Sequence, residues 1–74
     1  MKLLVRGSQT SERVDLLLRF TRINNEYTIA AIKAHLVQGQ RVTRAAYIHG
    51  MPASNLFRAL NVLEQVAIDI ERIK

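Results

Sequence analysis

Apolar residues recur at helical spacing along most of the chain, and this pattern predicts four helices. The predicted helices span Ser11–Thr21, Glu26–Gln38, Thr43–His49 and Ala53–Glu71. The sequence shows no strand pattern, internal repeat or low-complexity run. We therefore expect one all-α domain of about four helices over residues 1–74, with a loose N-terminal arm at residues 1–9 that carries Lys2 and Arg6.

The first predicted helix has apolar residues on two nearly opposite sides. One stripe consists of Val14, Leu17 and Leu18, and the other of Leu16, Phe20 and Ile23. Such a helix needs cover on both sides, either at the centre of the core or at a contact between subunits. Thr10 or Ser11 can cap its start, and Asp15 and Arg19 are spaced for an i,i+4 ion pair.

The second predicted helix lies between turn signals at both of its ends. Asn24–Asn25 can cap its start, and Gly39 can end it in a left-handed conformation. Its apolar stripe contains Ile29, Ile32 and Leu36. This helix has the place in the chain of the scaffold helix that packs behind a helix-turn-helix.

Residues 42–63 have the spacing of a helix-turn-helix. Gly50 suits the point where a helix ends with positive φ, and Pro52 suits the first position of the next helix. Ala46 is small enough to let two helices cross closely, and Met51 and Leu56 can fill the angle between them. Any tight corner between two helices can show this spacing, so it favours a unit that reads nucleic acid without requiring one.

The last predicted helix has a continuous apolar seam. The seam residues are Leu56, Leu60, Leu63, Ala67 and Ile70. Beside them, Val62, Val66 and Ile73 form a shoulder. This shoulder either packs against the first helix or contacts a second copy of the chain, and the sequence leaves both interpretations open.

Charge along the chain favours a polyanionic partner. Lys and Arg number 11 against 6 Asp and Glu, which gives a net charge of +5. The excess lies in residues 1–58, while residues 59–74 have a net charge near −1. Most of the cations are Arg, whose planar fork suits phosphates and guanine edges better than an ammonium group does.

Polar residues that suit base and phosphate contacts gather around the predicted corner. If Leu56 points inward, then Ser54, Arg58 and Asn61, followed by Gln65, point outward. Arg58 can bridge guanine O6 and N7, and Asn61 can bridge adenine N6 and N7. Asn55 and Phe57 flank this face, and arginines at the start of the preceding helix can clamp phosphates. The candidate DNA-binding residues are Arg41, Thr43, Arg44, Ser54, Asn55, Arg58 and Asn61.

Catalytic and metal-binding chemistry has little support in the sequence. His35 and His49 are 14 residues apart, and neither has another ligand at metal-binding spacing. The absence of Cys excludes zinc fingers and disulfide scaffolds, and the scattered glycines form no nucleotide-binding loop. Met1–Arg6 is too short for a signal peptide or a membrane span. We expect a soluble, cytoplasmic protein that is not an enzyme and needs no cofactor or metal.

The run Tyr27–Leu63 resembles the adhesin-biosynthesis transcription regulators, the PapB-type proteins of bacterial fimbrial operons. The matching features are A-I-K-A-H-L-V-Q-G at Ala31–Gly39, Met51, and Leu56 with the leucines at 60 and 63. The turn departs from some members, which have Gln or Asn where this chain has Gly50 and Pro52. The resemblance implies an all-helical regulator that binds DNA as a dimer or higher oligomer. It also implies DNA contacts by the matching residues Arg44, Ser54, Asn55 and Arg58.

These observations predict a regulator that binds double-stranded DNA and acts by occupying a promoter region. When bound to DNA, the protein would be associated with the nucleoid. A protein-interaction module, such as an antirepressor or a plasmid-control adaptor, would use the same helical corner for a different partner. An RNA-binding role is less favoured, because the chain has few aromatic residues on which bases could stack.

Overall fold

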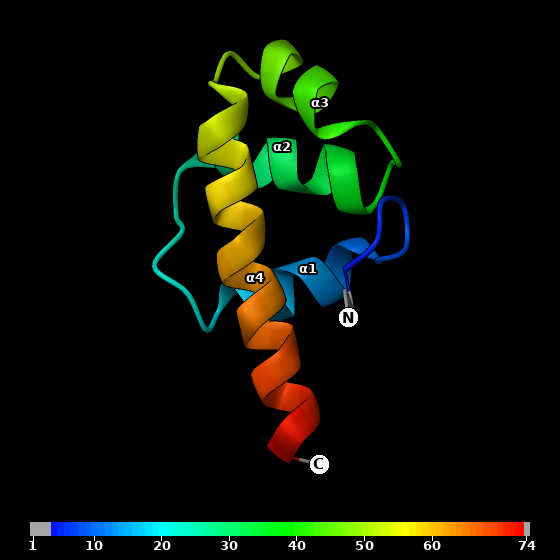
Figure 1. The fold of residues 1–74 in the computed structure, drawn as a ribbon, viewed down its shortest axis with the longest axis vertical. Helices are drawn as coiled ribbons and strands as arrows, with labels where there is room; N and C mark the ends of the chain where they lie inside the picture. Colours follow the sequence, from blue (N-terminus) through cyan, green and yellow to red (C-terminus); the bar gives the residue numbers. More distant parts are fainter. Residues whose placement is uncertain (1–3, 74) are drawn as a thin grey trace.

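The computed structural model describes residues 4–73 and confirms the expected all-α, four-helix fold (Figure 1). The helices are α1 (Ser11–Leu18), α2 (Glu26–Leu36), α3 (Val42–Ile48) and α4 (Ala53–Ile73). No strand occurs within this range. Lys2, one of the two cations expected on the arm, lies outside the described residues. Helix α4 is the axis of the fold: α2 and α3 pack on its N-terminal half, and α1 crosses it further along (Figure 1).

Side chains at the helix starts satisfy backbone N–H groups as the sequence indicates. The Thr10 hydroxyl accepts a hydrogen bond from the N–H of Arg13 at 3.1 Å, so Thr10, and not Ser11, caps α1. The carboxamide oxygen of Asn25 accepts from the N–H groups of Tyr27 and Thr28. These caps fix where α1 and α2 begin.

Helix α1 ends three residues earlier than expected, at Leu18 instead of Thr21. The N–H groups of Phe20 and Thr21 turn back to the carbonyls of Leu17 and Leu18. The Thr21 hydroxyl also donates to the Leu18 carbonyl at 2.9 Å, and its oxygen accepts from Ile23. Thr21 thus takes over a carbonyl that a longer helix would need, and the chain leaves α1 as a tight turn.

The core lies where α4 meets the other three helices. The largest fully buried side chains are Val14, Leu17, Ile32, Leu36, Leu56 and Leu63. Ala59 and Ala67 are also buried on α4, and no polar or charged side chain is buried among the described residues. Most of the predicted seam is therefore inside, and Ala59, which the spacing did not predict, is buried beside it.

Only one of the two apolar stripes on α1 is buried. Val14, Leu17 and Leu18 are in the core, whereas Phe20 of the second stripe is 63% exposed and Leu16 is also exposed. The expected ion pair on this helix is wrong: Asp15 pairs with Lys33 of α2, at 2.7 Å between carboxylate and ammonium, instead of with Arg19. This contact joins two helices that the sequence alone could not bring together.

The N-terminal arm is not loose over residues 4–9. Leu4 is buried in the core, and its N–H donates to the Glu64 carboxylate of α4 at 3.0 Å. The N–H groups of Gly7 and Gln9 donate to the carbonyls of His35 and Leu36 at the end of α2. These two carbonyls have no partner within the helix, so the arm completes the C-terminus of α2. The expectation of a loose arm is therefore wrong for this segment.

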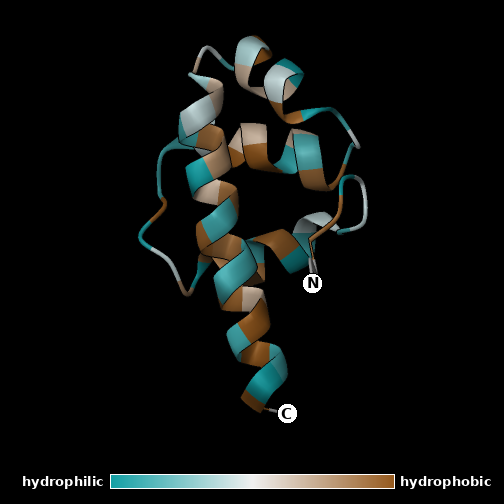
Figure 2. Cartoon of the chain, in the orientation of Figure 1, coloured by the Kyte–Doolittle hydropathy of each residue, from teal (hydrophilic) through white to brown (hydrophobic). Residues whose placement is uncertain are grey.

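The C-terminal end of α4 projects beyond α1 without a neighbouring helix (Figure 1). Figure 2 shows hydrophobic residues along this projecting end. Ile73 is 85% exposed, and Phe20, Val66 and Ile70 line a shallow hollow with it. The predicted shoulder on α4 is therefore only partly covered by this chain's own α1.

Candidate nucleic-acid interface

The corner between α3 and α4 has the turn that its sequence predicts. Gly50 adopts φ +69°, and the N–H of Met51 reaches back to the carbonyl of Ala46 at 3.0 Å. This pairing closes the last turn of α3 with glycine in the left-handed position. Pro52 stands one residue before α4, where its carbonyl accepts from the N–H of Asn55 and of Leu56. Pro52 therefore precedes the first helical position, which is Ala53.

The first turns of α4 separate an inward apolar side from an outward polar side. Leu56, Ala59 and Leu63 are buried. The four predicted contacts on this helix are all exposed: Ser54, Asn55, Arg58 and Asn61. Their common exposure follows from the helical period, because the three buried residues fix which side faces the core.

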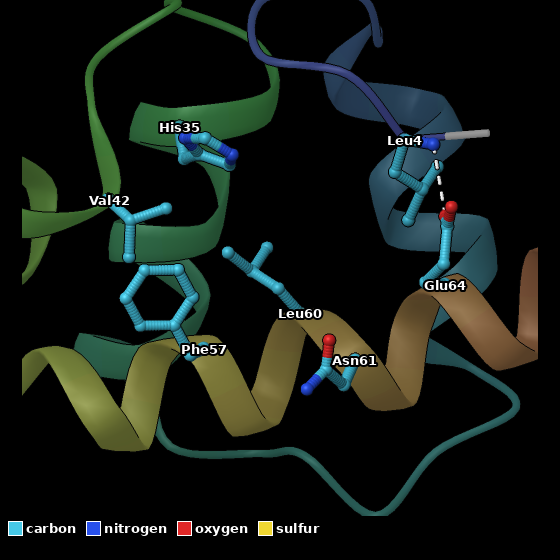
Figure 3. Close-up of a pocket in the computed structure, with 7 residues that line it drawn as sticks. All are labelled: Leu4, His35, Val42, Phe57, Leu60, Asn61 and Glu64. Atoms are coloured by element: carbon cyan, nitrogen blue, oxygen red, sulfur yellow. Dashed lines mark hydrogen bonds between the residues drawn. The ribbon is translucent and has the colours of Figure 1, made fainter. Parts of the chain in front are cut away.

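The start of α3 adds three exposed residues on a second element. Arg41 is the N-cap of α3 through its backbone, with no hydrogen bond from its side chain to the helix. Thr43 and Arg44 follow in the first turn, and all three are exposed. Figure 3 shows Val42 beside the ring of Phe57, so this corner joins the start of α3 to the flank of α4. Phe57 therefore has a structural contact, although half of its surface remains exposed.

Charge around this corner is positive. No Asp or Glu occurs between Glu26 and Glu64 in the sequence, a stretch that includes all of α3 and the first turns of α4. Arg41, Arg44 and Arg58 make no ion pair with any carboxylate of residues 4–73. Three unpaired guanidinium groups near one helical corner create a local potential that attracts anions.

The polar face of α4 changes character after Asn61. The side-chain amide of Gln65 donates to the Asp69 carboxylate at 3.0 Å, which ties it to an acidic neighbour. The Glu64 carboxylate accepts from the N–H of Leu4 (Figure 3). Gln65, which shares the outward side of the helix, is therefore less suited to DNA contact than the residues before it.

Wider, open hollows of about 360 and 390 Å³ lie beside Asn55 and Arg58, and the more enclosed hollow on the flank of α4 is too small for a ligand. Leu4, His35, Val42, Phe57, Leu60, Asn61 and Glu64 line it (Figure 3). Its volume is about 50 Å³, whereas small-molecule sites typically enclose about 300–1,000 Å³. His35 is engaged there, because its Nδ1 lies 2.7 Å from the Gln40 carbonyl oxygen.

Nowhere in residues 4–73 do three or more potential ligands gather to hold a metal ion. None of the four helices is long and apolar enough to span a membrane.

The structure adds Tyr47 to the candidate contacts. Tyr47 lies on α3 and is 86% exposed. It follows Arg44 by three residues and Thr43 by four, so the three side chains share one side of α3. A phenolic hydroxyl can donate to a phosphate oxygen. This spacing is present in the sequence, so the period of α3 alone indicates that Tyr47 shares a side with Thr43 and Arg44.

Comparison with known proteins gives a match in fold. No family model and no curated protein matches this sequence. The structure superposes on the crystal structure of FocB from E. coli with a TM-score of 0.87 and 24% sequence identity. The match covers 95% of this chain and 80% of FocB. At this level of identity the likeness shows that the two chains share a fold.

Proposed function

We propose that this protein is a sequence-specific DNA-binding transcriptional regulator. In this proposal, the first turns of α4 read base edges, and the start of α3 contacts the phosphate backbone. The protein occupies a promoter region on the bacterial chromosome, in the cytoplasm, and performs no chemical step. Backbone contacts fix the position of the protein on the duplex, and base contacts select the sequence.

The observation that carries the proposal is the polar, carboxylate-free corner of α3 and α4. It combines three unpaired arginines with exposed residues that can hydrogen-bond bases, on two helices joined by a tight turn. Two-helix corners of this kind place the second helix in the major groove of B-DNA. The resemblance of residues 27–63 to PapB-type regulators further supports a role at a fimbrial or adhesin operon. The shared fold with FocB is consistent with the all-helical architecture that this resemblance implies.

Assembly is part of the same proposal. The second stripe of α1 and the shoulder of α4 leave exposed apolar side chains at Leu16, Phe20, Val62 and Ile73. A second copy of this chain, packed against the projecting end of α4, would cover them. Two subunits would also present two recognition helices to successive half-sites. We propose a homodimer or a higher homo-oligomer as the DNA-binding form.

Salt-dependent binding tests the proposal most directly. The protein should bind duplex DNA more tightly than single-stranded RNA, and the logarithm of its binding constant should fall linearly with the logarithm of salt concentration. Arg44→Ala should weaken binding to every duplex about equally and reduce the steepness of this salt dependence by about one unit. Arg72→Ala removes the same charge on the polar side of α4, seven residues after Gln65 and away from the apolar shoulder, and should leave the salt dependence unchanged.

A footprint on the promoter region of the protein's own operon then tests sequence preference. Protection of a defined site supports the proposal. Absence of duplex binding at low salt refutes it and leaves the protein-interaction module as the alternative. If Arg44→Ala abolished binding to the preferred site and left a scrambled duplex unaffected, the phosphate-contacting role of Arg44 would be wrong.

A further inference from the structure

Residues 5–8 of the arm form a tight turn with an arginine at its corner. The N–H of Ser8 donates to the Val5 carbonyl at 3.0 Å, and the Ser8 hydroxyl accepts from the N–H of Val5 at 3.1 Å. Gly7, at the third position of the turn, has φ +72°, the conformation that a type II turn requires there. Arg6 is the second residue of the turn and is exposed. The turn therefore fixes the backbone from which Arg6 projects.

This turn lies against the loop that leads from α2 into α3 (Figure 1). A Cβ added to Gly7 would lie 3.2 Å from the Cα of Gly39, which is closer than most real Cβ contacts. Gly39 also has a positive φ, at +80°. Two glycines thus allow the arm and the loop to cross backbone against backbone. A side chain at position 7 would push the arm away from the loop.

Hydrogen bonds hold the arm on both sides of this crossing. On one side, the N–H groups of Gly7 and Gln9 donate to the end of α2, at 3.0 Å and 2.9 Å. On the other, the N–H of Leu4 donates to Glu64 of α4. The arm is therefore attached to two helices of the core, and Arg6 does not have to be ordered from a disordered tail when it binds.

The crossing brings Arg6 close to the arginines at the start of α3. Arg6 is one residue from Gly7, and Arg41 is two residues from Gly39. Because the two glycines are in contact, the Cα atoms of Arg6 and Arg41 can be at most about 16 Å apart. Arg6 is not paired with any carboxylate of the described residues, which is also true of Arg41. Both side chains are exposed. Two free guanidinium groups whose backbones lie within this limit can reach phosphates of the same DNA strand.

We infer that the arm is a second phosphate-binding element, in which Arg6 contacts the DNA backbone beside Arg41 and Arg44. Gly7 and Gly39 act as positioning residues, because their contact determines where the turn stands. The inference rests on the proposed function and extends it from the α3–α4 corner to the N-terminal turn. It implies that one subunit protects a longer stretch of DNA than the α3–α4 corner alone would protect, and that the extra length lies on the side of α3.

The test is a salt titration of binding to one duplex of fixed sequence by the full chain and its variants. Arg6→Gln should reduce the steepness of the salt dependence by about 0.9. The ratio of the wild-type binding constant to that of the variant should therefore become about three- to fourfold smaller between 50 and 200 mM salt. Arg6→Lys should retain the wild-type slope, because an ammonium group also binds a phosphate. Arg72→Gln is the matched control, and its slope should equal that of wild type.

A second variant tests the positioning role of the crossing. Gly7→Ala should lower duplex affinity in the wild-type background and have no further effect in Arg6→Gln, because the displaced turn acts through Arg6. If the wild-type chain binds duplex DNA but Arg6→Gln and Arg72→Gln have the same salt dependence, the inference is overturned and the proposed function stands. A wild-type chain that does not bind duplex DNA would overturn both. Thermal unfolding of Arg6→Gln should match that of wild type, since its side chain makes no contact in the core.

Discussion

The two halves of α4 share one apolar seam but differ in what covers them. In the first half, residues 53–61, the inward side packs on α2 and α3 and the outward side is polar. In the second half, residues 62–73, α1 covers part of the inward side and the end of the helix projects alone. The first half thus resembles a surface for a polar partner, and the second resembles a surface that a protein would cover.

Helix length explains this difference. At 1.5 Å per residue, the 21 residues of α4 extend for about 32 Å, whereas the eight residues of α1 extend for about 12 Å. The longest dimension of the molecule is 36 Å, so α4 alone accounts for most of it. Because α1 is so much shorter than α4, it leaves the C-terminal end of α4 without a neighbouring helix among the described residues (Figure 1). In the proposed function, residues 53–61 are the DNA-facing half of α4 and residues 62–73 are its assembly half.

The largest expected effect removes a core side chain in the first half. Leu56 is fully buried, and Leu56→Ala should lower the free energy of unfolding by about 2–5 kcal/mol, because it leaves a cavity. Ile73→Ala, in the exposed end, should change it by less than about 0.5 kcal/mol. Urea denaturation below the concentration at which the wild type associates measures both. Equal losses in the two variants would contradict the difference in cover.

A charge in the second half should break assembly. Val66 is partly buried and lines the hollow with Phe20, so Val66→Glu would place an unpaired carboxylate in a covered interface. Light scattering at micromolar concentration should report at least a dimer for the wild type and a monomer for Val66→Glu, with DNA affinity lost. Gln65→Glu adds the same charge on the polar side and should still associate. A well-folded, monomeric wild type across this range would refute the assembly proposal.

A smaller effect is expected from the centre of the DNA-facing half. Arg58 is exposed one turn after Ser54, where a helix in the major groove meets a base edge. Arg58→Ala should cost about 1–3 kcal/mol at the preferred site and relax the preference at one base pair, expected to be G·C. Arg58→Lys should recover general affinity without that discrimination, because an ammonium group cannot form the two-pronged contact. Binding-site selection gives the consensus of each variant, and an unchanged consensus for Arg58→Ala would rule out base reading by this residue.

Local features of the fold could be predicted from the sequence. The spacing alone did not tell which of the two stripes of α1 is buried, whereas the cap at Asn25 and the turn at Gly50 depend on residues within a few positions of one another. For the same reason, the exposure of Arg58 and of the other candidate contacts follows from the period of one helix. Their joint role in DNA binding remains a proposal.

Contacts between distant segments could not be predicted in this way. Asp15 has Arg19 at the favourable local spacing, yet it pairs with Lys33 because α1 and α2 pack together. The arm is attached by backbone N–H groups and by one buried leucine. Its sequence has no hydrophobic period, and such a period would not reveal backbone hydrogen bonds in any case. The early end of α1 is a local feature that the apolar period also missed, because the Thr21 hydroxyl bonds the carbonyl of Leu18, three residues earlier.

The smallest expected effect concerns the turn that orients the DNA-facing half. A Cβ at Gly50 would meet no atom within 4 Å, so Gly50→Ala is opposed only by the positive φ of this residue. That conformation costs an L-residue about 1 kcal/mol, and Gly50→Asn should cost less because Asn tolerates it better. If the strain opens the angle between α3 and α4, duplex affinity should fall while the oligomeric state stays that of wild type. Duplex titration measures the affinity, light scattering on the same samples measures the oligomeric state, and thermal unfolding measures the loss of stability. A Gly50→Ala protein that lost association but kept its DNA affinity would show that the two halves of α4 are not divided as proposed.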